Sequence, residues 1–244
     1  MEPALSIARF VEDARMVSPV RDEPLAIEWL PNGRTSLVVR VPEDGRGDAY
    51  VIGPRTRAKF KRASGFVRAT VIQVKPGWAP SLFGVRANAL TDQLVTFDEL
   101  WGASSGDITT SLVAARSVPA MLDRLSRAIA ARRLFESASA ALARRAARMF
   151  EAAETRVQVV AQQLGVSARH LHRAFIENVG IGPKEFARGV RLHRAIRESA
   201  RSRDWGMIAR DAGYYDQAHL IGDFRDLLGL TPSAYLARRL SHQA

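Results

Sequence analysis

Hydrophobic residues in the first part of the chain occur in short runs separated by Pro, Gly and Asn. Four runs rich in Val and Ile predict β-strands: LAIEWL at 25–30, SLVVRV directly before Pro42, AYVIG at 49–53 and FVRATVIQV at 66–74. Short strands with frequent turns indicate a β-rich barrel or sandwich rather than a doubly wound parallel sheet.

The pattern changes to helical periodicity after residue 102. Residues 107–116 and 119–135 predict helices, and the second carries an apolar stripe made of Met121, Leu122, Leu125, Ile129 and Leu134. This stripe either covers the open end of the β domain or pairs with a second copy of the chain. The sequence leaves both open, because both arrangements require the same pattern.

A further Ala- and Arg-rich helix is predicted at 138–153, so we expect the domain boundary near 134–140, inside helical sequence. The fold class is then α+β, with a β-rich domain at 1–135 and an all-α domain at 136–244. A chain of 244 residues is long enough for two modest domains that each bury a core.

The C-terminal half contains one pattern twice. Both copies read A-x-x-x-G and then L-x-x-x-F-x-x-x-x-G-x-x-P-x-x-[FY], and the second has one extra residue in its turn. The matched positions are Ala161, Gly165, Leu171, Phe175, Gly180, Pro183 and Phe186 in the first copy and Ala209, Gly213, Leu220, Phe224, Gly229, Pro232 and Tyr235 in the second.

Each position of this repeat has a physical reason. A small Ala lets two helices cross closely, and Gly supplies a left-handed turn that a Cβ would resist. Leu and Phe four residues apart share one face of the next helix and anchor it to the core. The second Gly and the Pro then end that helix and start another. The repeat therefore predicts two helix-turn-helix units, which are a DNA-binding arrangement.

The first recognition helix is predicted at about 167–178, with Ser167 as its N-cap. With Leu171 and Phe175 facing inward, Arg169 and Arg173 point outward and His172 lies at the edge of that face. Arginine suits bidentate hydrogen bonding to guanine in the major groove, so these residues are candidates for base contacts. Phosphate contact or plain solvation is the alternative for each arginine. His170 also turns outward, toward the DNA backbone.

The second recognition helix, about 216–227, has a different outward face. Its outward positions are Ala218 and Gly222, which cannot make a bidentate hydrogen bond, with Ile221 at the edge. Gln217 could bond adenine and Ile221 could touch a thymine methyl. His219 and Arg225 are also available for DNA contact. The alternative is that this unit mainly grips phosphates.

One long helix is predicted between the two units, at 184–201. Its eighteen residues would make a rod of roughly 27 Å. Successive major grooves on one face of DNA lie about 34 Å apart. A rod of this length plus two helix radii could hold both recognition helices on one face of the duplex.

Charge is distributed unevenly along the chain. The formal net charge is +11, but residues 1–118 hold 15 Lys and Arg against 13 Asp and Glu, whereas residues 119–244 hold 21 against 12. The basic half is therefore the half that carries the repeat, as expected for a protein that neutralises phosphates.

Several function classes are disfavoured by composition. The chain has no Cys, so it has neither disulfides nor thiolate metal sites, which fits a reducing cytoplasm. The stretch MEPALSIARFVEDARM lacks the basic region of a signal peptide, and no window approaches 18 apolar residues. We therefore expect a cytoplasmic protein without a transmembrane helix.

The stretches VVAQQLGVSARHLHRAFIENVGIGPKEFARGVRLHRAI and MIARDAGYYDQAHLIGDFRDLLGLTPSAYLARRL resemble the AraC/XylS-type transcriptional regulators. The resemblance covers roughly the last 90 residues, and G-L-T-P-S-A-Y is among its more specific marks. It implies a sequence-specific regulator of transcription with two helix-turn-helix units. Family members often carry polar or basic residues where this chain has Ala218 and Gly222, so base reading by the second unit is in question.

The N-terminal part looks like the cupin-like domain of one branch of such regulators. The matching segments are P-N-G at 31–33, V-I-G-P at 51–54, V-K-P-G-W at 74–78 and D-E-L-W-G at 98–102. Such a domain senses a small effector or mediates contacts only. The expected partner is double-stranded DNA, and RNA polymerase, a small-molecule effector and a second copy of the chain are candidate partners. No cofactor is expected.

The rival function is an enzyme, namely a cupin-like enzyme fused to a DNA-binding module. Cupin catalysis usually needs a metal held by His and carboxylate, but all five histidines lie in the C-terminal half: His170, His172, His193, His219 and His242. Repair methyltransferases with a similar DNA-binding pair use a cysteine acceptor, which is absent. No spacing singles out Glu28, Arg34 or Asp98, so we expect no catalytic residue and no metal site. Trp29, Trp78 and Phe83 could line a ligand pocket, although such aromatic residues are more often core.

Overall fold

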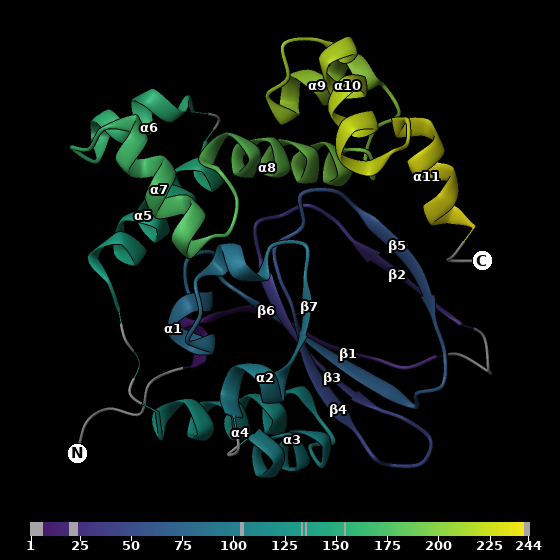
Figure 1. The fold of residues 1–244 in the computed structure, drawn as a ribbon. Coiled ribbons are helices and arrows are strands. Elements are labelled where there is room, and N and C mark those ends of the chain that lie inside the picture. Colours follow the sequence, from purple (N-terminus) through teal and green to yellow (C-terminus); the bar gives the residue numbers. More distant parts are fainter. Residues whose placement is uncertain are drawn as a thin grey trace.

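The computed structural model describes residues 7–19, 24–102, 105–132, 134, 136–153 and 155–241. A β-rich part lies below a row of helices, and one long helix, α8, crosses above the sheets with a helical unit at each of its ends (Figure 1). The predicted fold class, a β-rich region followed by an all-helical region, is confirmed.

Two antiparallel sheets form the β-rich part. The larger has the strand order β1-β6-β3-β4-β7 and the smaller pairs β2 with β5. The strands are β1 Val11–Val17, β2 Leu25–Trp29, β3 Thr35–Val41, β4 Asp48–Ile52, β5 Lys59–Ala63, β6 Arg68–Val74 and β7 Leu94–Thr96. The four predicted runs correspond to β2, β3, β4 and β6. The pattern missed β1, β5 and β7 because these strands lie at sheet edges and are largely exposed and polar or very short.

Short helices cover one end of the larger sheet. They are η1 Ile7–Arg9, α1 Ala79–Phe83, η2 Ala87–Leu90, α2 Phe97–Trp101, α3 Ser105–Val113 and α4 Val118–Ala130. The apolar stripe of α4 packs into the core of its own β domain, where Met121, Leu125 and Ile129 are buried. This is the first of the two alternatives for the stripe. Trp78 and Phe83 belong to the same core.

The C-terminal helices are α5 Ala138–Ala152, α6 Val157–Gln163, α7 Ala168–Asn178, α8 Pro183–Glu198, α9 Trp205–Ala212, α10 Gln217–Leu228 and α11 Pro232–Leu240. Two sequence expectations need correction. The described residues between α4 and α5 are not helical, so the expected boundary does not lie inside a helix. The linker helix ends at Glu198 with Ser199 as its C-cap, earlier than the expected residue 201. The division at 135 and 136 stays a prediction.

Each helix-turn-helix unit has a hydrophobic core of its own. The first is built around Phe150, Phe175 and Phe186, and the second around Phe224 and Tyr235. Within the part of the chain that the structure describes, no helix combines the length and apolar character needed to cross a membrane.

Candidate nucleic-acid interface

The first helix-turn-helix unit consists of α6, a turn and α7. Gly165 in the turn has φ +68° and Gly180 after α7 has φ +91°, so both occupy the left-handed region in which a Cβ is disfavoured. Leu171 and Phe175 are fully buried. Ser167 caps α7 by accepting a hydrogen bond from the His170 backbone N–H at 3.1 Å. The repeat therefore has the local structure that its residues predict.

The second unit, α9 and α10, repeats this construction. Gly213 and Gly229 have φ +86° and +69°, and Leu220 and Phe224 are fully buried. Asp216 is the N-cap of α10, and its carboxylate accepts a hydrogen bond from the His219 N–H at 2.7 Å. The sequence pattern did not assign this cap.

The structure places every proposed DNA-contact residue at the surface of its recognition helix. Ile221 is half-buried against the core of the second unit. The others are exposed, namely Ser167, Arg169, His170, His172, Arg173, Gln217, His219 and Arg225. The His219 ring meets the Tyr214 ring edge-on, with 5.3 Å between their centroids. Exposure makes these side chains accessible to a duplex. Their roles stay a proposal.

A buried acidic residue that the sequence interpretation missed joins α10 to the linker helix. Asp223 is 3% exposed. It accepts hydrogen bonds from Arg188 at 2.9 and 2.7 Å and forms an ion pair with Arg191 at 3.6 Å. When the two repeats are aligned on Leu171 and Leu220, Asp223 matches the buried Ala174. The sequence does carry a signal for this residue, because the second copy has a charged residue at a position that belongs to the core in the first copy.

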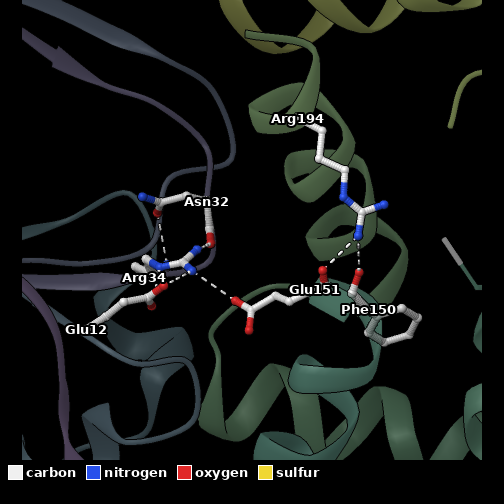
Figure 2. Close-up of polar contacts among 6 residues, drawn as sticks. All are labelled: Glu12, Asn32, Arg34, Phe150, Glu151 and Arg194. Carbon is white, nitrogen blue, oxygen red and sulfur yellow. Dashed lines mark hydrogen bonds and ion pairs between the residues drawn. The ribbon is translucent and has the colours of Figure 1, made fainter. Parts of the chain in front are cut away.

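The N-terminal domain is bound through Arg34 to α5, whose buried residues belong to the core of the first unit (Figure 2). Its guanidinium donates to Glu12 at 2.7 and 2.6 Å and to Glu151 of α5 at 2.9 Å. Arg194 of α8 donates to the Glu151 carbonyl at 2.7 Å. Because Glu151 lies at the end of α5, this cluster ties the edge of the β-rich part, α5 and α8 together.

The smaller sheet is fastened to the second unit. The Tyr235 hydroxyl of α11 donates to Glu28 of β2 at 3.0 Å, and burial raises the pKa of that hydroxyl. The Ala58 N–H donates to the Leu227 carbonyl at 2.7 Å. Both helix-turn-helix units therefore contact the N-terminal part directly.

Two of the N-terminal segments used for the resemblance lie at these contacts. A Cβ on Gly33 would lie 2.4 Å from the Phe186 ring, and one on Gly189 would lie 2.9 Å from the Pro31 carbonyl. Trp78 supports the Arg144 guanidinium of α5 at 3.8 Å from its ring centroid. P-N-G and V-K-P-G-W thus pack against helices of the DNA-binding part.

Acidification is expected to lower the stability of the folded chain through His193 of α8. Burial, together with the positive charges of Arg34 and Arg197, lowers the pKa of His193 to about 4 from 6.5. A group whose pKa is lower in the folded state contributes stability that is present above the unfolded pKa and is lost as the pH falls toward the folded value. The free energy of unfolding should fall by at most about 1.4 kcal/mol per pH unit from this group, between about pH 6.5 and 4.

Thermal unfolding of the wild type and of His193→Gln across this pH range checks the prediction. The variant should lose this part of the pH dependence, because Gln does not titrate. Identical pH dependence in both proteins would contradict it.

Exposed recognition helices on two units that share one linker helix define a DNA-binding protein of the transcription-regulator class. Residues 160–238 match the family described as "Helix-turn-helix domain", and residues 1–96 match a domain of unknown function, DUF6597. The chain is thus a DNA-binding transcriptional regulator with an AraC-type helix-turn-helix domain, as the sequence resemblance indicated.

Comparison with curated proteins gives no match. Among solved structures, ToxT from Vibrio cholerae O395 is similar at 13% identity, with a TM-score of 0.45, over 92% of this chain and 93% of that one. Unsaturated fatty acid bound wild-type ToxT from Vibrio cholerae strain SCE256 also has 13% identity, with a TM-score of 0.42, over 92% of this chain and 90% of that one.

Proposed function

We propose that the chain regulates transcription by placing α7 and α10 in successive major grooves on one face of a duplex. The observation that supports this is the arrangement of the two units at the ends of α8 (Figure 1). The 16 residues of α8 make a rod of about 24 Å. With a helix radius of about 5 Å at each end, the span approaches the groove separation of about 34 Å.

The first unit is proposed to read bases. Arg169 and Arg173 are exposed on the outer face of α7 and suit guanine, with His172 beside them. His170 is assigned to the DNA backbone, and Ser167 begins the helix as its cap.

The second unit is proposed to add mainly affinity. Its outward positions Ala218 and Gly222 offer no polar side chain, whereas Arg225 is exposed and can contact a phosphate. Gln217, His219 and Ile221 are the remaining candidates for base contact. Specificity would then be concentrated in the groove that α7 occupies.

A pocket of about 240 Å³ between the two sheets supports effector sensing by the N-terminal domain. It is somewhat smaller than the typical ligand pocket of about 300–1,000 Å³, so any effector that it holds would be small. Val38, Val71 and Ile52 line it together with Arg55, which is 3% exposed. Arg55 donates a hydrogen bond to the Asp92 carbonyl at 2.6 Å. The Nε of Arg55 has no hydrogen-bond partner within the described residues. We infer an effector that carries an anionic group.

The same pocket is connected to both helix-turn-helix units. Glu28 and Arg34 line it, and they also bond Tyr235 and Glu151. A ligand that displaced either side chain would change how one unit is held. This connection favours a sensing domain over a domain that only mediates contacts.

Enzymatic activity is not part of the proposal, because the β-rich part has no His or Cys in its sequence. RNA polymerase and a second copy of the chain stay candidate partners. A dimer would need a surface other than the α4 stripe, which its own core covers.

Selection of bound sequences from a random duplex pool tests this function, with and without a small-molecule extract of cells. We expect one enriched motif, binding that weakens steeply with salt, and an extract-dependent change in affinity. A folded protein that enriched no sequence would contradict regulation by specific binding, and no change with extract would contradict effector sensing.

A further inference from the structure

A cleft separates the first recognition helix from a segment of the N-terminal domain. Its volume is about 610 Å³. On one side it is lined by side chains of α7 and its cap. On the other side it is lined by Arg86, the N-cap residue of η2, and by Asn88 within η2. The α7 side carries the proposed DNA-contact residues Ser167, Arg169, His170, His172 and Arg173.

The N-terminal segment is held firmly at this place. The Thr91 hydroxyl donates to the Gly180 carbonyl at 2.6 Å, directly after α7. A Cβ on Gly180 would lie 2.8 Å from the Thr91 hydroxyl, 2.9 Å from the Ala87 carbonyl and 3.0 Å from Pro54. Gly180 thus provides both the left-handed turn and the close approach, and η2 packs on α7. The position of Arg86 beside the recognition helix therefore follows from packing.

The charge of the cleft is largely positive. Arg86 and Asn88 are exposed, and in the described part of the chain no hydrogen bond or ion pair engages the Arg86 side chain. Arg86 faces the same cleft as Arg169 and Arg173, and Glu177 is the carboxylate among the lining residues. Arg34 and Arg40, by contrast, are paired with carboxylates.

A helix in the major groove has a phosphate strand on each side, because the groove is only about 12 Å wide. A rigid protein segment fixed next to that helix must either contact one of the two DNA strands or block the entry of the helix into the groove. A cationic side chain beside an amide suits contact with a phosphate.

We propose that Arg86, with Asn88 beside it, binds a backbone phosphate next to the groove occupied by α7. The N-terminal domain would then be part of the DNA interface itself. This inference rests on the proposed function, in which α7 enters the major groove.

The test compares full-length wild type, Arg86→Ala, Arg86→Lys and the control Arg46→Ala on the selected duplex and on single-base mutants of it. Arg46 is an exposed arginine in the turn between β3 and β4. That turn lies at the opposite end of the β-rich part from α7 (Figure 1). Arg86→Ala should weaken binding about three- to tenfold on every duplex and lower the salt slope by about 0.9. Arg86→Lys should keep most of the affinity, and Arg46→Ala should match the wild type.

Three results would overturn the inference. Unchanged affinity and slope in Arg86→Ala would show that the residue does not touch DNA. Tighter binding would show that the segment blocks the groove. A wild-type protein without salt-dependent binding to any duplex would remove the proposed function as well, and this outcome is distinct from the other two.

Discussion

Replacing Asp223 with Ala is expected to lower the free energy of unfolding by about 3–5 kcal/mol, because removing one partner of a buried ion pair leaves the other charge uncompensated. The Asp223 side chain is 4% exposed, and those of Arg188 and Arg191 are 27% and 17% exposed. The variant would leave Arg191 without the Asp223 carboxylate and Arg188 with only the exposed Asp226. Loosening of α10 should also weaken DNA binding.

Asp226→Ala is the matched control. Asp226 is on the same helix and bonds the same Arg188, at 3.0 Å, but its side chain is 69% exposed. An exposed ion pair contributes about 0–1 kcal/mol, so this variant should be nearly as stable as the wild type. Urea unfolding followed by circular dichroism measures both. Equal losses in the two variants would contradict the role given to burial.

Replacing Arg173 with Ala is expected to weaken binding to the preferred site by about 1–3 kcal/mol and to relax the preference at one base pair. The reason is geometric: α7 presents Arg173 outward, one turn after Arg169, while Leu171 and Phe175 hold the opposite face in the core. Fluorescence anisotropy on the preferred duplex and on its single-base mutants gives both quantities.

Arg225→Ala is the comparison from the second unit. It should weaken binding nearly equally on all sequences and lower the salt slope by about 1, as expected for a phosphate contact. Uniform loss in Arg173→Ala would argue against base reading by the first unit. A more selective half-site under Gln217–Gly222 would show that the proposed asymmetry is reversed.

The recognition helices were predicted to within a residue of their bounds, because their determinants are local. A cap such as Ser167 acts three residues away, and an inward Leu–Phe pair spans one turn. The edge strands β1 and β5 were not predicted, since their polar residues give no alternation that marks a buried face. The end of α8 was placed three residues too late, as helix ends are the least certain part of such a pattern.

The sequence by itself determined the double helix-turn-helix, because the left-handed glycines Gly165 and Gly213 and the buried aromatic residues stand at matching offsets in the two copies, which differ by one residue in the turn. Only the tertiary structure decided how the two parts meet. Arg34 and Glu151 are 117 residues apart, and Glu28 and Tyr235 are 207 residues apart. Periodicity tells which face of an element is buried but not which distant element covers it. The pairing of those side chains, and the position of Arg86 beside α7, therefore became visible only in the folded chain.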